Sequence, residues 1–197
     1  MNAYRIRFAS QADASALLDI YRQYINLPVT FEEVCPAVSV FRERIKHISE
    51  KYPYLVCEHN GSPVGYAYAH EQHARAAYRW NAELSVYINP EYTGKRIGNA
   101  LYGALTELLQ IQHFVNLYAY VTLPNERSEA LHWAFGFALC GICRHTGFKA
   151  GQWHDVGIFE KKITDKAGVP QEPVPITALP AGQLDALLNK YSVMIKA

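Results

Sequence analysis

The centre of the 197-residue chain reads Leu-Ser-Val-Tyr-Ile-Asn-Pro from Leu84 to Pro90 and Thr-Gly-Lys-Arg-Ile-Gly-Asn-Ala from Thr93 to Ala100. The β-branched and aromatic residues of the first run predict a strand that Asn-Pro ends. The second run is a glycine-containing turn before a predicted helix. Because a helix N-terminus presents unpaired N–H groups and partial positive charge, the two runs together predict a phosphate site. A solvated basic turn is the alternative, and the spacing matches neither a dinucleotide fingerprint nor a P-loop.

Elements predicted on either side of this centre give the order βααβββαβαββ. Strands are expected where apolar residues alternate or form short runs, and helices where they recur every three or four positions. The Asn60-Gly61 pair between two strand patterns predicts a β-hairpin. The expected strands cover 4–9, 54–58, 64–69, 81–88, 114–122, 138–144 and 155–161, and the expected helices cover 10–25, 40–48, 99–112 and 128–135. The predicted fold class is therefore α/β, with a mixed sheet covered by helices.

The last part of the chain differs from the rest in composition. Four prolines between residues 164 and 180 predict an extended segment, and apolar residues at helical spacing between 184 and 191 predict a terminal amphipathic helix. We expect residues 1–164 to form one domain, and residues 165–197 to be a proline-containing tail and helix. The helix is expected to pack on that domain or on a partner subunit.

Composition and charge exclude several classes of protein. Lysine and arginine number 19 against 18 aspartates and glutamates, for a net charge of +1, which argues against a nucleic-acid-binding protein. No run of 18 apolar residues is present, so no membrane span is expected, and the N-terminal residues do not resemble a signal peptide. These features favour a cytoplasmic protein whose four cysteines are free, buried thiols. The histidine spacing does not predict a metal site.

Four further motifs stand in order along the chain. They read Tyr-Ala-Tyr-Ala at 66–69, Tyr-Arg-Trp-Asn-Ala-Glu at 78–83, Leu-Pro-Asn at 123–125 and Gly-Phe-Lys-Ala-Gly-Gln-Trp-His-Asp-Val at 147–156. With the central turn they resemble the GNAT superfamily of N-acetyltransferases over residues 4–180, and more narrowly the phosphinothricin and methionine-sulfoximine acetyltransferases. The resemblance implies the GNAT fold and transfer of acetyl from acetyl-CoA to the primary amine of a small amino-acid analogue.

The resemblance assigns catalytic roles to two residues. Glu83, which begins the central strand, takes the position of the general base, and a carboxylate near an apolar, aromatic site can have a raised pKa suited to that role. An exposed charge at a strand end is the alternative. His132 stands where many relatives carry a tyrosine near the coenzyme sulfur. It either donates a proton to the thiolate or orders a water there, or it is an ordinary hydrogen-bonded histidine.

The resemblance also implies which residues bind acetyl-CoA. The central strand of the family splays from its neighbour, so free backbone groups of Val86, Tyr87 and Ile88 are expected to hold the pantetheine arm. Asn125 and Ser128 match a second contact, although they are equally suited to capping the following helix. The phosphate turn contributes Lys95, Arg96, Ile97, Gly98 and Asn99. The family usually has glycine where this chain has Arg96, which is tolerable if the φ angle of Arg96 stays negative.

The substrate is expected to meet Arg75, Tyr78, Phe31 and Ser85. The guanidinium of Arg75 suits a carboxylate or phosphinate. Tyr24, Phe31 and Tyr87 are candidate aromatic walls, although each is also a core candidate. His154 is expected to hold a loop over the site. Two other functions remain open, a GNAT enzyme for a peptide N-terminus or polyamine, and an acyl-CoA-binding module without catalysis. Relatives tend to be homodimers, so a homodimer is expected.

Overall fold

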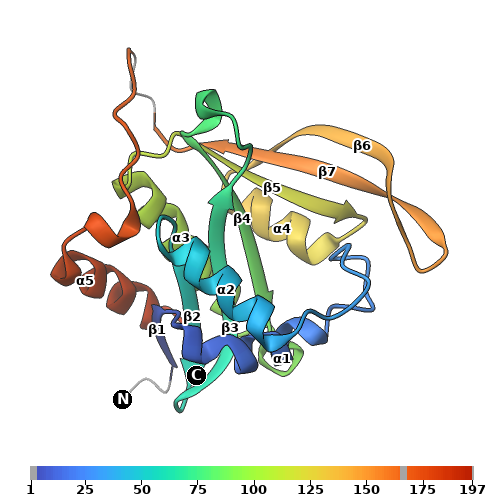
Figure 1. Cartoon of the computed structure of the whole chain (residues 1–197), viewed down its shortest axis with the longest axis horizontal. Helices are drawn as coiled ribbons and strands as arrows, with labels where there is room; N and C mark the ends of the chain where they lie inside the picture. The colour runs from blue at the N-terminus through green and yellow to red at the C-terminus, as the bar shows by residue number, and fades with distance from the viewer. Residues whose placement is uncertain (1–3, 165–167, 197) are drawn as a thin grey trace.

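The computed structural model describes residues 4–164 and 168–196. Seven strands form one mixed sheet in the order β1-β2-β3-β4-β5-β7-β6, and all neighbours are antiparallel except β4 and β5 (Figure 1). The strands are β1 (Tyr4–Phe8), β2 (Tyr54–His59), β3 (Ser62–Glu71), β4 (Asn81–Ile88), β5 (Asn116–Leu123), β6 (Ala138–Lys149) and β7 (Gln152–Lys162). The α-helices are α1 (Ala14–Arg22), α2 (Val38–Ser49), α3 (Ile97–Ile111), α4 (Glu126–Ala134) and α5 (Ala181–Ser192). The predicted element order and the mixed sheet are confirmed.

Helices cover both faces of the sheet, and small residues on one face of β3 and β4 allow close packing. Ala67, Ala69 and Ala82 are fully buried in the core that includes α3. Side chains alternate along a strand, so their neighbours in sequence point to the opposite face. On that face, Tyr54 and Tyr66 pack in a second core formed with α1 and α2. The sheet therefore presents an aliphatic face to α3 and a tyrosine-rich face to α1 and α2.

The sheet opens between its two parallel strands, β4 and β5. Only three pairs join them, of which Glu83 and Tyr118 are the last. Beyond this point β4 stays paired with β3 as far as Ile88, and β5 stays paired with β7 as far as Leu123. The facing edges of β4 and β5 are therefore unpaired from residues 84 and 119 onward, and the strands diverge (Figure 1). This is the splay that the resemblance predicts.

The β6–β7 hairpin is longer than predicted. The sequence predicts strands over 138–144 and 155–161, with residue 154 in a loop, but the strands continue to a two-residue turn at Ala150 and Gly151, whose φ angles are 52° and 78°. The hairpin packs on the α1–α2 connection, where Lys149 Nζ donates to the Glu32 carbonyl at 2.9 Å. A Cβ on Gly147 would lie 2.2 Å from the ring of Phe31. His154 lies within β7, so the expectation that it belongs to a loop is wrong. Its Nε2 lies 3.1 Å from the Lys149 carbonyl oxygen.

The C-terminal helix α5 packs on β1 and α3 of its own chain. Leu187, Leu188 and Ile195 are buried in the core that contains α3. The ring of Tyr191 lies so close to Gly103 that a Cβ there would stand 2.5 Å from it. At the end of this segment, Lys196 N–H donates to the carbonyl of Lys95, which belongs to the predicted phosphate turn. The C-terminal segment therefore supports the helix that begins at that turn.

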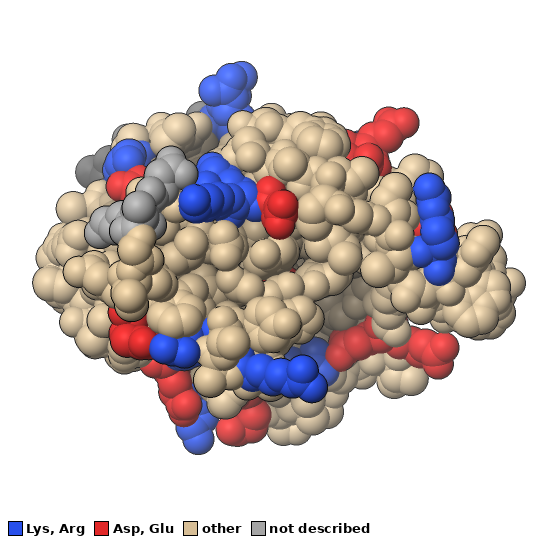
Figure 2. Space-filling model, turned by 90° about the horizontal axis from the view of Figure 1, so that it is seen from above, with Lys and Arg blue, Asp and Glu red and all other residues tan. Residues whose placement is uncertain are grey.

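Free cysteines and charged residues complete the description. All four cysteines are free. Cys57 is buried and Cys35 is half-buried, but Cys140 and Cys143 are exposed on β6, so the expectation of buried thiols is wrong for these last two. The strand that carries them, β6, forms one edge of the sheet (Figure 1). Acidic and basic side chains are scattered over the face seen in Figure 2. Among the described residues, no helix has the length and apolar character needed to cross a membrane.

Candidate active site

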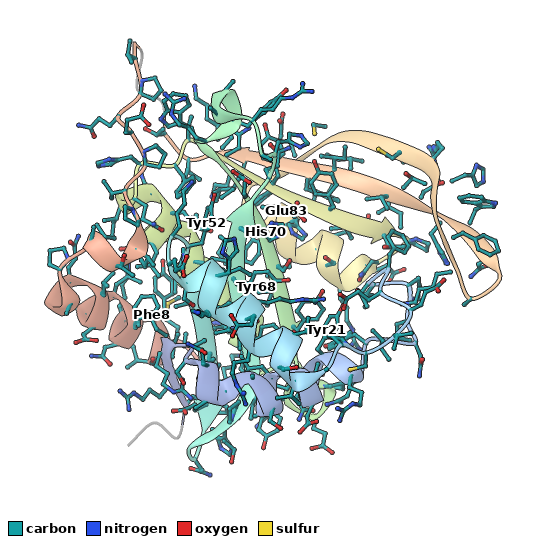
Figure 3. All side chains as sticks on the ribbon, viewed as in Figure 1. Phe8, Tyr21, Tyr52, Tyr68, His70 and Glu83 are labelled. Atoms are coloured by element: carbon teal, nitrogen blue, oxygen red, sulfur yellow. The ribbon has the colours of Figure 1, made fainter. Side chains whose placement is uncertain are left out.

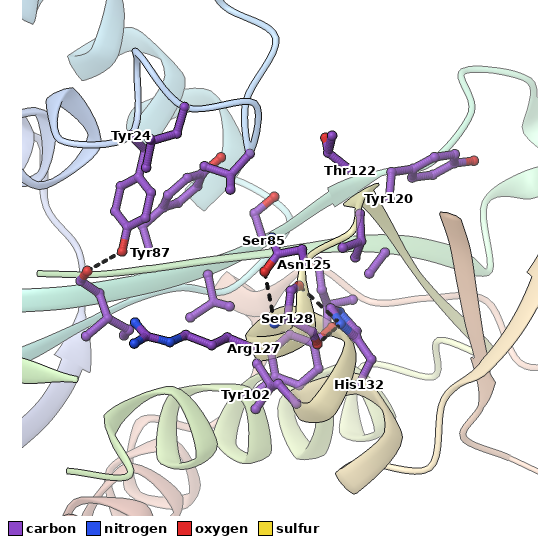
Figure 4. A pocket seen from close by; sticks show the side chains of 18 of the residues that line it. Tyr24, Ser85, Tyr87, Tyr102, Tyr120, Thr122, Asn125, Arg127, Ser128 and His132 are labelled. Carbon is purple, nitrogen blue, oxygen red and sulfur yellow. Dashed lines mark hydrogen bonds between the residues drawn. The ribbon is translucent and has the colours of Figure 1, made fainter. Parts of the chain in front are cut away.

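A cavity of about 420 Å³ lies in the opening between β4 and β5 (Figure 4). Consecutive residues 84–88 of β4 and 119–122 of β5 form two of its walls, and the start of α4 forms a third. The remaining lining residues come from α3 and from the segments around α1 and the phosphate turn, namely Tyr24, Leu27, Val29, Thr93 and Tyr102. The cavity therefore follows from the sheet topology, because it occupies the space that a paired strand would otherwise fill.

A second cavity, of about 480 Å³, lies at the N-terminus of α3 and adjoins the first. The two share Ile88, Thr93, Arg127 and Leu131 among their lining residues, and we call the combined space the groove. Four of the five residues predicted to bind phosphate line it, namely Arg96, Ile97, Gly98 and Asn99. The first residues of a helix have N–H groups without intrahelical partners, and the Ala100 N–H bonds back to the carbonyl of Arg96. One end of the groove therefore has N–H donors whose chemistry suits an anion.

Arg96 adopts a left-handed conformation immediately before α3, with φ 65° and ψ 15°. The expectation that its φ stays negative is wrong. The chain reverses direction through Gly94, whose φ is 80°, and then enters the helix, and this path requires a left-handed residue at position 96. An L-residue other than glycine loses roughly 1–2 kcal/mol in this conformation. Arg96 lines the groove beside the α3 N-terminus.

We expect the Arg96→Gly variant to be slightly more stable than the parent protein. Relief of roughly 1–2 kcal/mol of backbone strain is opposed by the roughly 0.5–1 kcal/mol that a glycine loses in conformational entropy on folding. Thermal unfolding followed by circular dichroism measures the difference. Lys95→Gly is the matched control, since Lys95 has no left-handed strain to relieve, and it should lose stability. A lower melting temperature for Arg96→Gly than for Lys95→Gly would contradict the strain assignment.

Glu83 lies at the closed end of the groove. It forms the last pair with β5, and the neighbouring residue Leu84 already lines the cavity, although Glu83 itself does not. Its side chain is 23% exposed, and its Oε1 lies 3.5 Å from Nε2 of His70 on β3. Figure 3 shows these two side chains together near the ends of their strands. The carboxylate is thus held beside the groove with partial access to solvent.

Two further residues of β4 continue the same face of the sheet as Glu83. Ser85 and Tyr87 both line the cavity, and they alternate with Val86 and Ile88, whose side chains face α3. Tyr87 is also surrounded by other tyrosine rings, which make edge and stacked contacts with it at 5.2–5.4 Å. The cross-strand pairs on this face are Glu83 with His70, Ser85 with Tyr68, and Tyr87 with Tyr66.

His132 is buried on α4 and lines the cavity (Figure 4). Its Nδ1 lies 2.6 Å from the Ser128 carbonyl oxygen, which can only accept, so Nδ1 carries the proton. Burial lowers the pKa of His132 below its ordinary value. The imidazole is therefore neutral near pH 7, and its Nε2 is an acceptor. This geometry favours ordering of a water over direct proton donation.

Asn125 and Ser128 lie at the start of α4, and both line the cavity. The Asn125 side chain accepts from the Ser128 N–H at 3.2 Å, so it caps the helix as the alternative interpretation expects. The carboxylate of Glu129 accepts from the Asn125 N–H at 2.8 Å and fixes the turn further. Both residues still line the groove, so the cap is compatible with the predicted contact to the coenzyme.

Besides Glu83, four of the residues predicted for the site lie outside both cavities. The Lys95 ammonium lies 5.9 Å from the centre of the Tyr4 ring, and Phe31 packs on the β6–β7 hairpin. Arg75 and Tyr78 are exposed in the connection after β3, where the Tyr78 ring contacts that of His73. This connection follows directly from the strand that carries His70. The structure brings the residues predicted for the coenzyme together except Lys95, and it does not place the three predicted substrate residues Phe31, Arg75 and Tyr78 against the groove.

The groove also contains residues that the sequence does not single out. Arg127 lines both cavities, between the α3 N-terminus and the opening of the sheet. Tyr102 lies fully buried on α3, and its hydroxyl has no hydrogen-bond partner among the described residues. Tyr24, expected as an aromatic wall, does line the cavity, and its hydroxyl donates to the Ile88 carbonyl. The main-chain oxygen of Ile88 therefore already accepts one hydrogen bond.

A sheet that opens beside a helix N-terminus is the arrangement that the motif resemblance predicts for an N-acyltransferase of the GNAT fold. Solved structures support that class. The structure of a GNAT superfamily phosphinothricin acetyltransferase from Sinorhizobium meliloti in complex with acetyl-CoA matches with a TM-score of 0.82 and 35% identity, over 87% of this chain and 95% of that one. A putative acetyltransferase from Salmonella typhimurium, solved with acetyl-CoA, matches with a TM-score of 0.78 and 27% identity, over 85% and 98%.

Sequence comparison gives the same family. Residues 6–158 match the acetyltransferase (GNAT) domain family, and the chain belongs to this family and is an acetyltransferase. A phosphinothricin N-acetyltransferase of Streptomyces viridochromogenes is 35% identical over 176 residues, which are 88% of this chain and 95% of the relative. An L-methionine sulfoximine/L-methionine sulfone acetyltransferase of Salmonella typhimurium is 26% identical over 173 residues, or 82% and 96%. The narrower resemblance to these two groups of enzymes is confirmed.

Proposed function

We propose that the protein transfers the acetyl group of acetyl-CoA to the primary amine of a small amino-acid analogue of the phosphinothricin, methionine sulfoximine or methionine sulfone type. The observation that carries this proposal is the opening of the sheet immediately beyond the Glu83–Tyr118 pair. It puts a carboxylate at the closed end of a groove whose other end is a helix N-terminus. The relatives named for these amines support the choice of substrate.

The chemistry of the groove fits acetyl-CoA. Pyrophosphate needs clustered N–H donors and positive charge, and the α3 N-terminus with Arg96 supplies both. Pantetheine carries amides that hydrogen-bond like a peptide strand, and the unpaired edge of β4 around Val86 and Tyr87 offers such partners. Acetyl-CoA supplies an acetyl group activated as a thioester. The chain itself has to position an amine, remove its proton and protonate the departing sulfur.

Glu83 serves as the general base in this proposal. Its carboxylate accepts the proton of the substrate ammonium, directly or through one water, and leaves the nitrogen lone pair free. The nitrogen then forms a bond to the acetyl carbon as the carbon–sulfur bond breaks, and it gives up its second proton to the water that protonates the departing thiolate. The neutral imidazole of His132 holds that water through its Nε2. A backbone N–H of β4 polarises the acetyl carbonyl.

The amino-acid end of the substrate is assigned to the connection after β3. Arg75 is exposed there, and its guanidinium can pair with a carboxylate through two parallel hydrogen bonds. Tyr78 and Phe31 provide aromatic surface at 41% exposure each, and Ser85 adds a hydroxyl within the cavity. A polyamine would instead require acidic groups at the position of Arg75, so this residue favours an anionic amino-acid analogue.

Replacing Arg127 by Ala is expected to raise the KM for acetyl-CoA about tenfold and to change kcat by less than about twofold. The reason is the loss of one charge-assisted hydrogen bond, worth roughly 1.5 kcal/mol, at a residue that lines both parts of the groove. Steady-state kinetics with varied acetyl-CoA measure both constants. Arg22→Ala, on the exposed face of α1, is the control. Equal KM values for parent and Arg127→Ala would remove Arg127 from the site.

A thiol-release assay over a panel of amines tests the proposed function. We expect release of coenzyme A with phosphinothricin, methionine sulfoximine or methionine sulfone, and an N-acetylated product by mass spectrometry. Turnover only with spermidine or with a peptide N-terminus would identify a GNAT enzyme for another amine. Binding of acetyl-CoA without turnover of any amine would identify a non-catalytic acyl-CoA-binding module. A homodimer and a cytoplasmic location, both expected from the sequence, stay predictions.

A further inference from the structure

His70 faces Glu83 directly across the β3–β4 ladder. The two residues form a register pair, and His70 Nε2 lies 3.5 Å from Glu83 Oε1 (Figure 3). The other ring nitrogen is also engaged, since Nδ1 lies 2.9 Å from the Glu71 carbonyl oxygen. The imidazole is one-third exposed, so it contacts both the carboxylate and solvent. Nothing in the predicted machinery uses this residue.

The number of protons in this contact follows from the chemistry of its atoms. A carbonyl oxygen only accepts, so Nδ1 of His70 must carry hydrogen to bond with Glu71. In a neutral imidazole Nε2 then carries a lone pair and is an acceptor. The carboxylate oxygens of Glu83 that it faces are acceptors as well. A favourable contact between His70 and Glu83 therefore requires one further proton, held on Nε2 or on Glu83.

We propose that His70 is a positioning residue for Glu83, and that it shares the accepted proton with the carboxylate beside the groove and passes that proton on to solvent. This inference rests on the proposed function, because it assigns a task only if Glu83 is the base. The proton taken from the substrate nitrogen by Glu83 moves to Nε2 of His70, which gives an imidazolium beside a carboxylate. The imidazolium releases the proton to water, and Glu83 is ionised again.

The groups around His70 set the pH at which this cycle works. Burial lowers the pKa of His70, but the hydrogen bond and charge of Glu83, with smaller contributions from Glu71, outweigh it and raise the pKa above its ordinary value. From its own strand, the Tyr68 ring packs on the imidazole. On α2, the positive charge of Arg44 acts to lower the pKa of Tyr68 and of Glu32. The neutral imidazole is the form that can take a proton, so activity should rise as pH increases through the raised pKa.

The test compares pH profiles of kcat/KM for the parent enzyme and the His70→Gln variant with one substrate. Gln places an N–H donor near Glu83 but does not titrate. The parent should show an ionisation above the ordinary pKa of histidine that is absent from His70→Gln, and kcat of the variant should fall at least about tenfold. The substrate amine contributes equally to both profiles. His47→Gln is the matched control, because His47 also faces a glutamate, Glu50, but on the exposed surface of α2.

A second measurement asks whether His70 acts through Glu83. In the Glu83→Gln background, His70→Gln should change kcat by less than about twofold, because two residues of one unit are not additive. Melting temperatures of all variants show whether they are folded. If Glu83→Gln retains full activity, the assigned base is wrong. If Glu83→Gln is inactive but His70→Gln keeps the parent pH profile and rate, only the role of His70 is overturned. Additive losses in the double variant would likewise overturn it.

Discussion

The Glu83→Gln variant should lose about 10²- to 10⁴-fold in kcat while its dissociation constant for acetyl-CoA stays within about twofold of the parent value. Gln is isosteric with Glu but cannot accept a proton, so the change removes the base and leaves the shape of the site. The coenzyme groove begins one residue further along β4, and its lining does not include residue 83. Pre-steady-state acetyl transfer and isothermal titration with acetyl-CoA measure the two quantities separately.

A carboxylate in the same row of the sheet provides the control. Glu83 pairs with Tyr118, which in turn pairs with Glu160 on β7, so Glu160 lies two strands away and is exposed. Glu160→Gln makes the same chemical change and should leave kcat within about twofold. Equal losses in the two variants would show that the effect is one of net charge. A Glu83→Gln enzyme with parent activity would exclude this residue as the base.

The Leu188→Ala variant should be less stable than the parent by about 2–5 kcal/mol, with a melting temperature roughly 5–15 °C lower. Leu188 is 4% exposed and belongs to the core shared by α5, β1 and α3. The loss is a substantial fraction of the roughly 5–15 kcal/mol that stabilises a whole domain. Differential scanning calorimetry measures it. We propose on this basis that the C-terminal segment folds as part of the acetyltransferase domain.

Val193→Ala is the matched control for Leu188→Ala. Val193 is 72% exposed at the end of the same helix, so its truncation should change stability by less than about 0.5 kcal/mol. The C-terminal segment also meets the phosphate turn, since Lys196 N–H donates to the Lys95 carbonyl. If this segment unfolds while the rest of the domain stays folded, the affinity for acetyl-CoA should therefore fall, although some activity remains. Equal melting temperatures for Leu188→Ala and Val193→Ala would show that α5 is not part of the core.

Much of the fold is predictable because its boundaries have local causes. Asn60-Gly61 and Asn89-Pro90 end strands through their own backbone preferences, and the strand that precedes Asn89 is predicted with the bounds it has in the structure. The β6–β7 hairpin is predicted too short because most of β6 is exposed on both faces. A strand with two exposed faces has no alternation of apolar and polar residues, and its length is set by the residues it pairs with.

The parts of the candidate site that are formed by residues adjacent in sequence can be predicted. The parts that depend on how strands pair cannot. The phosphate turn and the strand before it are adjacent in sequence, so their residues meet without tertiary information. Tyr102 has the helical spacing of a core residue, and only the opening of the sheet makes it line a cavity. Arg127 is one charge among several at a helix start. The contact of His70 with Glu83 depends on the β3–β4 register, which no pattern in either strand specifies.

The most direct test is a crystal structure of the Glu83→Gln variant with acetyl-CoA and phosphinothricin bound together. The pantetheine should lie between β4 and β5, with its amides hydrogen-bonded to the open edge of β4, and the pyrophosphate should contact the N–H groups that begin α3. The substrate nitrogen should lie within one water of residue 83 and next to the acetyl carbon. A coenzyme bound outside the opening of the sheet, or an amine on the far side of the sheet from residue 83, would contradict the proposed mechanism.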